Sequence, residues 1–164
     1  MSLTDFANRH VVISSAKPFN QAIKDIQAEM GKASTDTLAE KLSASQTFAE
    51  FTEEIEFLAG RSNFINVALL NWGKMMARVP IGMKGILFVI GNPLTARKLL
   101  EAGGAEVGLY LPTKIYVYED GEGVTQVTYD QIGPVMAPYN NPQLDAVAAV
   151  IDKALASLAD KAAN

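Results

Sequence analysis

The chain has 164 residues, enough for one domain with a sizeable core, and its 49% apolar and 20% charged residues are typical of a globular protein. Its net charge of −4 disfavours a nucleic-acid partner, because such proteins neutralise phosphates with a basic surface. The absence of cysteine and the presence of one histidine, His10, exclude disulfides, thiol nucleophiles, iron–sulfur clusters and histidine-rich metal sites within one chain, so we expect neither cofactor nor metal.

The first part of the chain is predicted to form a strand, a helix and then a pair of helices. Val11–Ile13 is β-branched and indicates a strand, and Pro18 opens a helix with apolar residues at helical spacing. Residues 34–60 are predicted as a helical insertion, with a capping box formed by Thr37 and Glu40. Its second helix carries an apolar stripe that is expected to face inward, made of Phe48, Phe51, Ile55 and Leu58.

The middle of the chain alternates between apolar segments and short helices. Residues 64–70 indicate a buried strand, with a helix as the alternative. Residues 72–79 are predicted as a short helix that ends at Pro80, and residues 85–90 as a central strand. Asn92 is suited to cap the next helix, since a proline follows at the first helical position, where no N–H is needed.

The last part of the chain is predicted as a hairpin followed by a long helix. Residues 113–119 alternate, which places Lys114, Tyr116 and Tyr118 on one face of a strand. Residues 120–123 form the loop, and residues 124–129 the returning strand. An irregular segment with two prolines, Pro134 and Pro138, is expected to lead to the closing helix.

This order of elements predicts an α+β fold. A hairpin late in the chain excludes an all-parallel sheet. We therefore expect one domain over residues 1–164, with a largely antiparallel sheet covered by two principal helices.

The sequence gives little evidence of a membrane span or a signal peptide. The longest uninterrupted apolar run, Ile86–Ile90, is far shorter than the roughly 18 residues of a membrane span. Residues 1–5 lack the basic start and apolar stretch of a signal peptide, which favours a cytoplasmic location. If Met-Ser-Leu has replaced a natural N-terminus, residues 1–5 give no evidence about a signal peptide. The sequence therefore leaves the cellular location open.

The familiar chemical motifs do not occur. Residues 82–85 lack the spacing of a phosphate-binding loop, and residues 119–122 lack that of a calcium loop. A Ser-His-Asp triad would have to use His10, which precedes a strand without a nucleophile elbow nearby. No catalytic residue is assigned.

The charges are distributed unevenly. No acidic residue lies between Glu56 and Glu101, whereas the same stretch holds Arg61, Lys74, Arg78, Lys84, Arg97 and Lys98. This local charge of +6, which leaves −10 elsewhere, would attract a carboxylate or phosphate ligand, especially together with Lys114. The plainer interpretation is that these cations pair with the acidic helices or are simply scattered over the surface.

Six residues are candidates for a ligand site. Trp72, beside two methionines, would grip an apolar ligand if exposed and would be ordinary core if buried. The face with Lys114 and the tyrosines, near a carboxylate at the end of the partner strand, could bind or protonate a small polar ligand, or could be a solvated sheet face. The candidate set is Asn92, Lys114, Tyr116, Tyr118, Asp130 and Trp72.

Three motifs in order carry a family resemblance: Gly91-Asn92-Pro93 after an apolar strand, Leu111-Pro112, and Val117-Tyr118-Glu119-Asp120 followed by glycine. With the closing helix, they resemble the bacterial family catalogued as domain of unknown function 302, over about residues 11–159. The resemblance implies a TATA-binding-protein-like fold of β-α-β4-α order with a curved sheet, and pairing as homodimers. It implies no activity, cofactor or catalytic residue. Where family members often have an acidic residue and a histidine after the second strand, this chain has Asn71-Trp72.

Three functions fit these features, and we favour the first. It is a homodimeric module that binds or senses a small anionic or amphipathic ligand. The second is a metal-independent enzyme with a Lys/Tyr/Asp acid–base set acting on a small acidic substrate, which requires a group that titrates abnormally near pH 7. The third is an interaction protein that docks a partner through the helical pair at 34–60.

Overall fold

A six-stranded sheet in the order β1-β6-β5-β4-β3-β2 forms the centre of the molecule. The computed structural model describes residues 5–79 and 81–164. The strands are β1 (His10–Ser15), β2 (Gly31–Lys32), β3 (Ile65–Asn71), β4 (Gly85–Gly91), β5 (Thr113–Glu119) and β6 (Thr125–Asp130). Neighbouring strands are antiparallel except β2 and β3. The predicted mixed α+β class is confirmed, and residues 64–70 form a strand rather than a helix.

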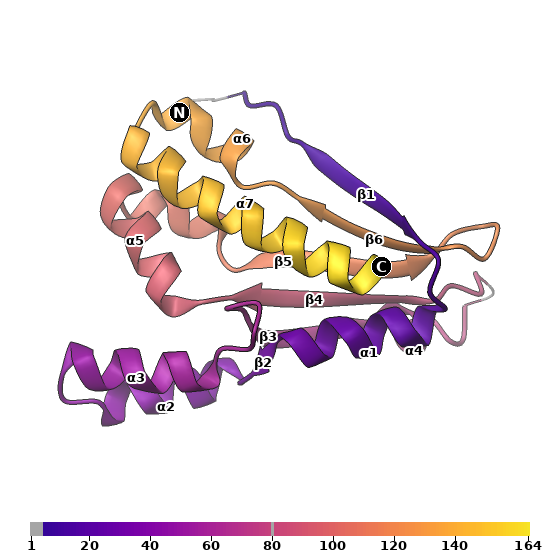
Figure 1. Ribbon diagram of the computed structural model, residues 1–164, viewed down its shortest axis with the longest axis horizontal. Coiled ribbons are helices and arrows are strands. Elements are labelled where there is room, and N and C mark those ends of the chain that lie inside the picture. Colours follow the sequence, from indigo (N-terminus) through magenta and orange to yellow (C-terminus); the bar gives the residue numbers. More distant parts are fainter. Residues whose placement is uncertain (1–4, 80) are drawn as a thin grey trace.

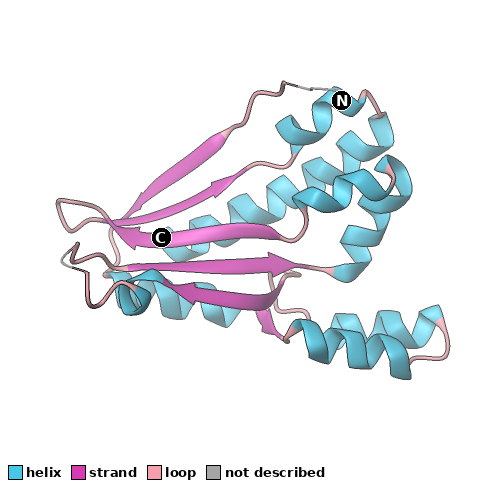
Figure 2. Cartoon of the chain, turned by 180° about the vertical axis from the view of Figure 1, so that it is seen from behind, coloured by secondary structure: helices cyan, strands magenta, loops and turns pink. Residues whose placement is uncertain are grey.

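Two long helices cover one face of this sheet and leave the other face open. Helices α1 (Phe19–Glu29) and α7 (Pro142–Ala163) lie in front of the strands in Figure 1, and the view from behind shows the strands uncovered (Figure 2). The covered face holds the core, because alternate strand residues such as Phe88, Ile115 and Val127 are fully buried against the apolar side of α7. The polar residues of the alternation consequently line the open face.

Further helices close one end of the sheet. They are α5 (Pro93–Gly103), η1 (Ala105–Tyr110), α6 (Gly133–Met136) and η2 (Ala137–Tyr139). The prediction of an irregular segment around Pro134 and Pro138 was wrong, because both prolines occupy first-turn positions, where a missing N–H costs nothing. Helix α4 (Trp72–Met75) has four residues and is shorter than predicted. Pro80, the expected end of that helix, lies outside the described residues.

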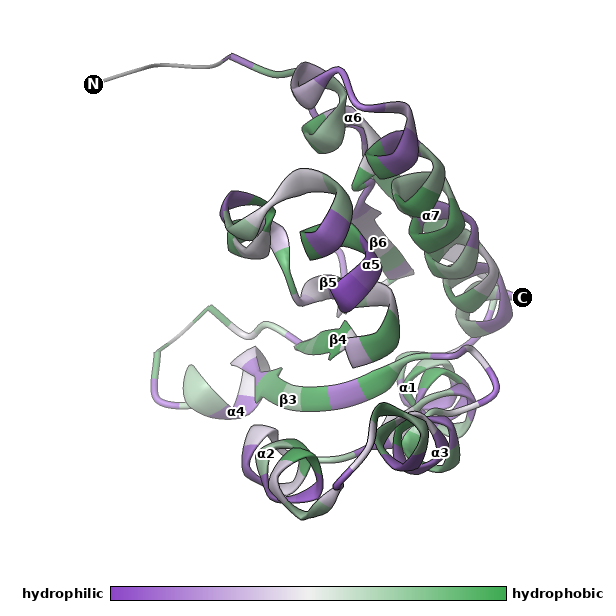
Figure 3. Cartoon of the chain, turned by 90° about the vertical axis from the view of Figure 1, so that its left-hand side faces the viewer, coloured by the Kyte–Doolittle hydropathy of each residue, from purple (hydrophilic) through white to green (hydrophobic). Residues whose placement is uncertain are grey.

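The helical pair consists of α2 (Thr35–Ala44) and α3 (Phe48–Leu58) and lies beyond the β2–β3 edge of the sheet (Figure 3). The predicted capping box at Thr37 was wrong. Ser34 is extended and accepts a hydrogen bond from the Thr37 N–H, so the helix begins earlier. Phe51 and Ile55 are buried in a small cluster with Ile65, so the chain itself covers part of the predicted stripe.

The chain enters and leaves the pair at one crossing point. The N–H groups of Gly31 and Gly60 both donate to the carbonyl oxygen of Phe64, at 2.9 and 3.2 Å. A Cβ on Gly31 would lie 1.7 Å from the carbonyl oxygen of Leu58, and one on Gly60 would lie 2.3 Å from that of Glu29. Only glycine allows the two backbones to approach so closely.

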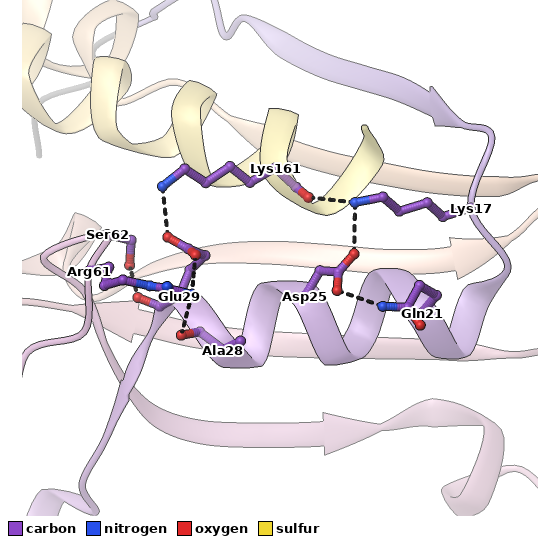
Figure 4. Close-up of polar contacts among 8 residues, drawn as sticks. All are labelled: Lys17, Gln21, Asp25, Ala28, Glu29, Arg61, Ser62 and Lys161. Atoms are coloured by element: carbon purple, nitrogen blue, oxygen red, sulfur yellow. Dashed lines mark hydrogen bonds and ion pairs between the residues drawn. The ribbon is translucent and has the colours of Figure 1, made fainter.

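A network of ion pairs joins this crossing point to the end of α7 (Figure 4). The Glu29 carboxylate lies 2.7 Å from Nζ of Lys161 and 2.6 Å from a guanidinium nitrogen of Arg61. The Lys161 hydrogen bond and then the Arg61 charge hold the pKa of Glu29 below its ordinary value, against the opposing effect of burial. On the neighbouring turn, Lys17 pairs with Asp25 at 2.7 Å and donates to the Lys161 carbonyl oxygen at 2.9 Å.

Candidate functional site

The open face of the sheet brings together polar residues from three strands. In the β1–β6 register, His10 faces Asp130 and Val12 faces Thr128. In the β5–β6 register, Tyr116 faces Thr128, and Lys114 comes one residue before the Ile115–Tyr129 pair, which places it beside Asp130. Antiparallel pairing therefore creates two adjacent cross-strand rows, in which every side chain except that of Val12 is polar.

These rows border a cavity of about 460 Å³ at the end of the sheet. Four of the six predicted site residues line it: Trp72, Lys114, Tyr116 and Asp130. The rest of the wall includes His10 and Thr128 and is otherwise largely apolar and aromatic, with contributions from Phe6, Leu87, Leu109, Tyr110, Ile132 and Val135. The volume is within the range of small-molecule sites.

His10 is held between a carboxylate and a hydroxyl group. Its Nδ1 lies 2.7 Å from the Asp130 carboxylate, and its Nε2 lies 2.9 Å from the Thr128 hydroxyl oxygen. The Thr128 hydroxyl donates its own hydrogen to the carbonyl oxygen of Val11 at 2.6 Å, so its oxygen is free to accept. The ring is thus fixed in orientation, and the Asp130 charge is engaged by His10.

Lys114 is the free charge of the cavity. It is exposed, and no carboxylate of residues 5–79 or 81–164 lies within 4.0 Å of its ammonium group. Three cations of the basic stretch, by contrast, are engaged: Arg61 by Glu29, Lys84 by Glu119 and Arg97 by Glu101. These three cations are therefore paired, although their partners lie on α1, β5 and α5 and not on the acidic helix α3.

The two tyrosines form a stacked pair on the same face. Their ring centroids are 5.2 Å apart, with planes inclined by 15°. Burial and then the neighbouring Tyr118 raise the pKa of Tyr116 above its ordinary value, so Tyr116 is a neutral hydrogen-bond donor at neutral pH. Tyr118 stacks behind it and does not itself line the cavity. The Tyr116 hydroxyl lies over Gly85, where a Cβ would come within 2.0 Å of it.

Asn92 lies apart from the other candidates. Its Oδ1 accepts from the Leu94 N–H at 2.9 Å and caps α5, and its Nδ2 donates to the carbonyl oxygen of Asn63 at 3.0 Å. It lines a second cavity rather than the first. The helix-capping expectation for this residue is confirmed, and the structure does not bring it to Lys114.

Sequence reasoning missed His10 and Thr128 as members of the site. The signal lay in register: a hairpin that pairs Tyr116 with Thr128 also brings the strand containing His10 alongside. The sequence alone does not show that β1 pairs with β6, because the two strands are more than a hundred residues apart in the chain.

Two absences concern the described part of the chain. It contains no group of three or more His, Asp or Glu side chains placed to hold a metal ion. None of its helices has the length and apolar character needed to cross a membrane.

Comparison with known proteins gives a family and a fold. The family model described as domain of unknown function DUF302 matches residues 39–162. The crystal structure of an uncharacterised conserved DUF302 protein from Bacillus stearothermophilus is similar to this chain, with a TM-score of 0.62 and 20% sequence identity, over 93% of this chain and 96% of that one. No functionally curated protein matches the sequence. At this identity the structural likeness shows the shared fold alone.

Proposed function

The chain belongs to the DUF302 family, for which no function is established, and from the geometry of its cavity we propose that it binds a small amphipathic anion. The observation that carries the proposal is the exposed Lys114 ammonium, without a carboxylate partner in the described chain, beside an apolar and aromatic wall. Such a cavity fits a molecule with a carboxylate at one end and an apolar body.

Each part of the cavity has a task in this proposal. Lys114 pairs with the carboxylate, and the ring of Tyr116, whose hydroxyl lies over Gly85, contacts the ligand body. His10 engages Asp130 and so weakens the repulsion that an incoming anion would meet. The half-buried Trp72, with Leu87 and the other apolar lining residues, contacts the ligand body.

The single tryptophan makes this proposal directly testable. Trp72 lines the cavity, so its fluorescence reports occupancy. We expect octanoate to change that fluorescence saturably, and Lys114→Met to weaken octanoate binding by about tenfold, the loss of one charged hydrogen bond. Lys98→Met, an exposed lysine on α5 outside both cavities, is the matched control and should leave binding unchanged.

The opposite results would count against the site. Equal octanoate affinity in Lys114→Met and the parent protein would show that Lys114 does not bind the ligand carboxylate. Native mass spectrometry of protein purified gently from its own host gives an independent check, since a retained small anion would appear as extra mass.

A metal-independent acid–base enzyme is the second candidate, and the His10–Asp130 pair favours it. A histidine oriented by a carboxylate, beside Lys114, is an arrangement that can move a proton to or from a small acidic substrate. The Tyr116 shift goes upward, away from neutrality, so Tyr116 is not the group that titrates near pH 7. Proton–deuterium exchange into a small acidic substrate, followed by NMR, tests this candidate, and an equal exchange rate in His10→Gln and the parent protein would overturn it.

We also propose the TATA-binding-protein-like topology and a homodimer in the cytoplasm. The topology is supported by the order that remains when β2, residues 34–60 and the helices between β3 and α7 (α4, α5, η1, α6 and η2) are set aside: a strand, a helix, four antiparallel strands and a helix. The uncovered sheet face supports pairing of two copies (Figure 2).

The third function, docking through the helical pair, would rest on the side chain of Phe57, which is 85% exposed.

A further inference from the structure

A second cavity, of about 370 Å³, lies between α2, α5 and the ends of the central strands, and we infer that it binds a neutral, apolar small molecule. The inference is independent of the proposed anion site. Pro112 and Thr113 line both cavities, but Lys114, His10 and Asp130 line only the first.

The chemistry of the lining determines the class of ligand. No lining residue carries a charge, and the apolar wall includes Leu38, Val67, Ile90, Leu100 and Leu111. The one amide, Asn92, is engaged by Leu94 and Asn63. A charged ligand group would lose its hydration without gaining a counter-charge, so the cavity selects a neutral ligand.

The remaining polar groups of the cavity lining can form a hydrogen bond to one hydroxyl or carbonyl group on the ligand. Thr35, Thr95 and Thr113 line the cavity, and none of their hydroxyls makes a hydrogen bond to another described residue. These hydroxyls can donate to or accept from a ligand oxygen. A primary alcohol with an alkyl chain therefore fits both parts of the lining.

Helix α2 provides the second, independent observation. None of its residues is buried, although its sequence is amphipathic. Leu38 is only half-buried and forms part of the cavity wall, and Leu42 is 51% exposed. A helix of ten residues depends on tertiary packing for stability. An apolar ligand would occupy the space between α2 and α5 and add contacts to Leu38.

The volume favours a small molecule over a protein segment. About 370 Å³ lies near the lower end of the range for small-molecule sites. The ligand thus joins α2 to the body of the protein, and its binding is expected to order α2.

Octan-1-ol is the probe, and the methyl groups of the lining are the reporters. In ¹³C-methyl-labelled protein we expect saturable shifts at Leu38, Val67 and Ile90. Ala96→Met places a larger side chain in the cavity wall and should weaken octan-1-ol binding at least tenfold. Ala156→Met, at an exposed position on α7, is the matched control and should not weaken it. Hydrogen exchange of the α2 amides should slow several-fold with octan-1-ol in the parent protein and not in Ala96→Met.

Each contrary outcome overturns the inference. These outcomes are the absence of saturable shifts, shifts confined to residues around Trp72, and unchanged octan-1-ol affinity in Ala96→Met. If Ala96→Met does not fold, Thr95→Leu fills the same wall and replaces it. Lys114→Met should leave octan-1-ol binding intact, so failure of the anion site and failure of this second site are distinguishable.

Discussion

Glu29 and Lys114 show two opposite uses of charge at the scale of single residues. Glu29 has a side chain that is only 11% exposed, and it contacts two cations that join α1, α7 and the crossing point of the helical pair. Lys114 is exposed beside an apolar cavity and has no carboxylate partner among the described residues. Paired charges hold elements together here, whereas the unpaired charge remains available to a ligand.

Replacing Glu29 by glutamine should destabilise the protein in a pH-dependent way. At pH 7 we expect a loss of about 1–2 kcal/mol in the free energy of unfolding, since one carboxylate partner of Lys161 and Arg61 disappears. The folded-state pKa of Glu29 is lowered from 4.5, so its stabilisation is present above that pH and is lost as the pH falls through the folded-state value. Urea denaturation at pH 7 and pH 3 measures both effects.

The control is Glu56→Gln, an exposed glutamate on α3 with no ion pair in the described chain. It should change stability by less than about 0.5 kcal/mol at either pH. A Glu29→Gln deficit that persisted undiminished at pH 3 would contradict the ion-pair explanation.

At the scale of elements, helix starts could be predicted where a capping residue and a proline occur together. Asn92 and Asn141 each cap a helix whose first position is proline, and this pattern predicts the starts of both α5 and α7. The same reasoning did not predict η1. It also placed the start of α2 too late, because the Ser34 hydroxyl accepts a hydrogen bond from the Thr37 N–H and Ser34, not Thr37, is the N-cap. It also could not foresee β2, which has two residues and exists only because β3 lies beside it.

The crossing point of the helical pair gives the prediction at this scale. Gly60→Ala should lower the free energy of unfolding by about 3 kcal/mol, because its Cβ would lie within 2.3 Å of backbone atoms of residues 29–31. Backbone atoms on both sides cannot move aside as a flexible side chain would. Thermal and urea denaturation measure the loss.

Gly121→Ala is the matched control, since nothing lies within 4 Å of a Cβ there. It should be nearly neutral, within about 0.5 kcal/mol. Equal stability of the two variants would show that the two backbones do not approach as closely as described.

At the scale of the whole molecule, the candidate site is a product of topology. The alternation along residues 113–119 was enough to place Lys114 and Tyr116 on one face, and that prediction is confirmed. The meeting of β1 with β6 then adds His10 and Thr128, and the short helices at the sheet end supply the apolar wall. Such contacts join residues over a hundred positions apart, and no local pattern encodes them.

That residues 34–60 are an insertion remains a prediction, which can be tested by deleting them from the full chain. The chain is brought back to Phe64 on both sides of the pair, by Gly31 and Gly60, so replacing residues 34–60 by a short Gly-Ser linker should leave the sheet and the α1–α7 layer connected. We expect a product that unfolds cooperatively but less stably than the parent, because Ile65 and Leu94 lose the cover of Phe51 and Ile55. Circular dichroism with urea measures both properties, and native mass spectrometry counts the subunits. A dimer would place the interface on the sheet, a monomer would place it on the helical pair, and an unfolded product would show that the pair belongs to the core.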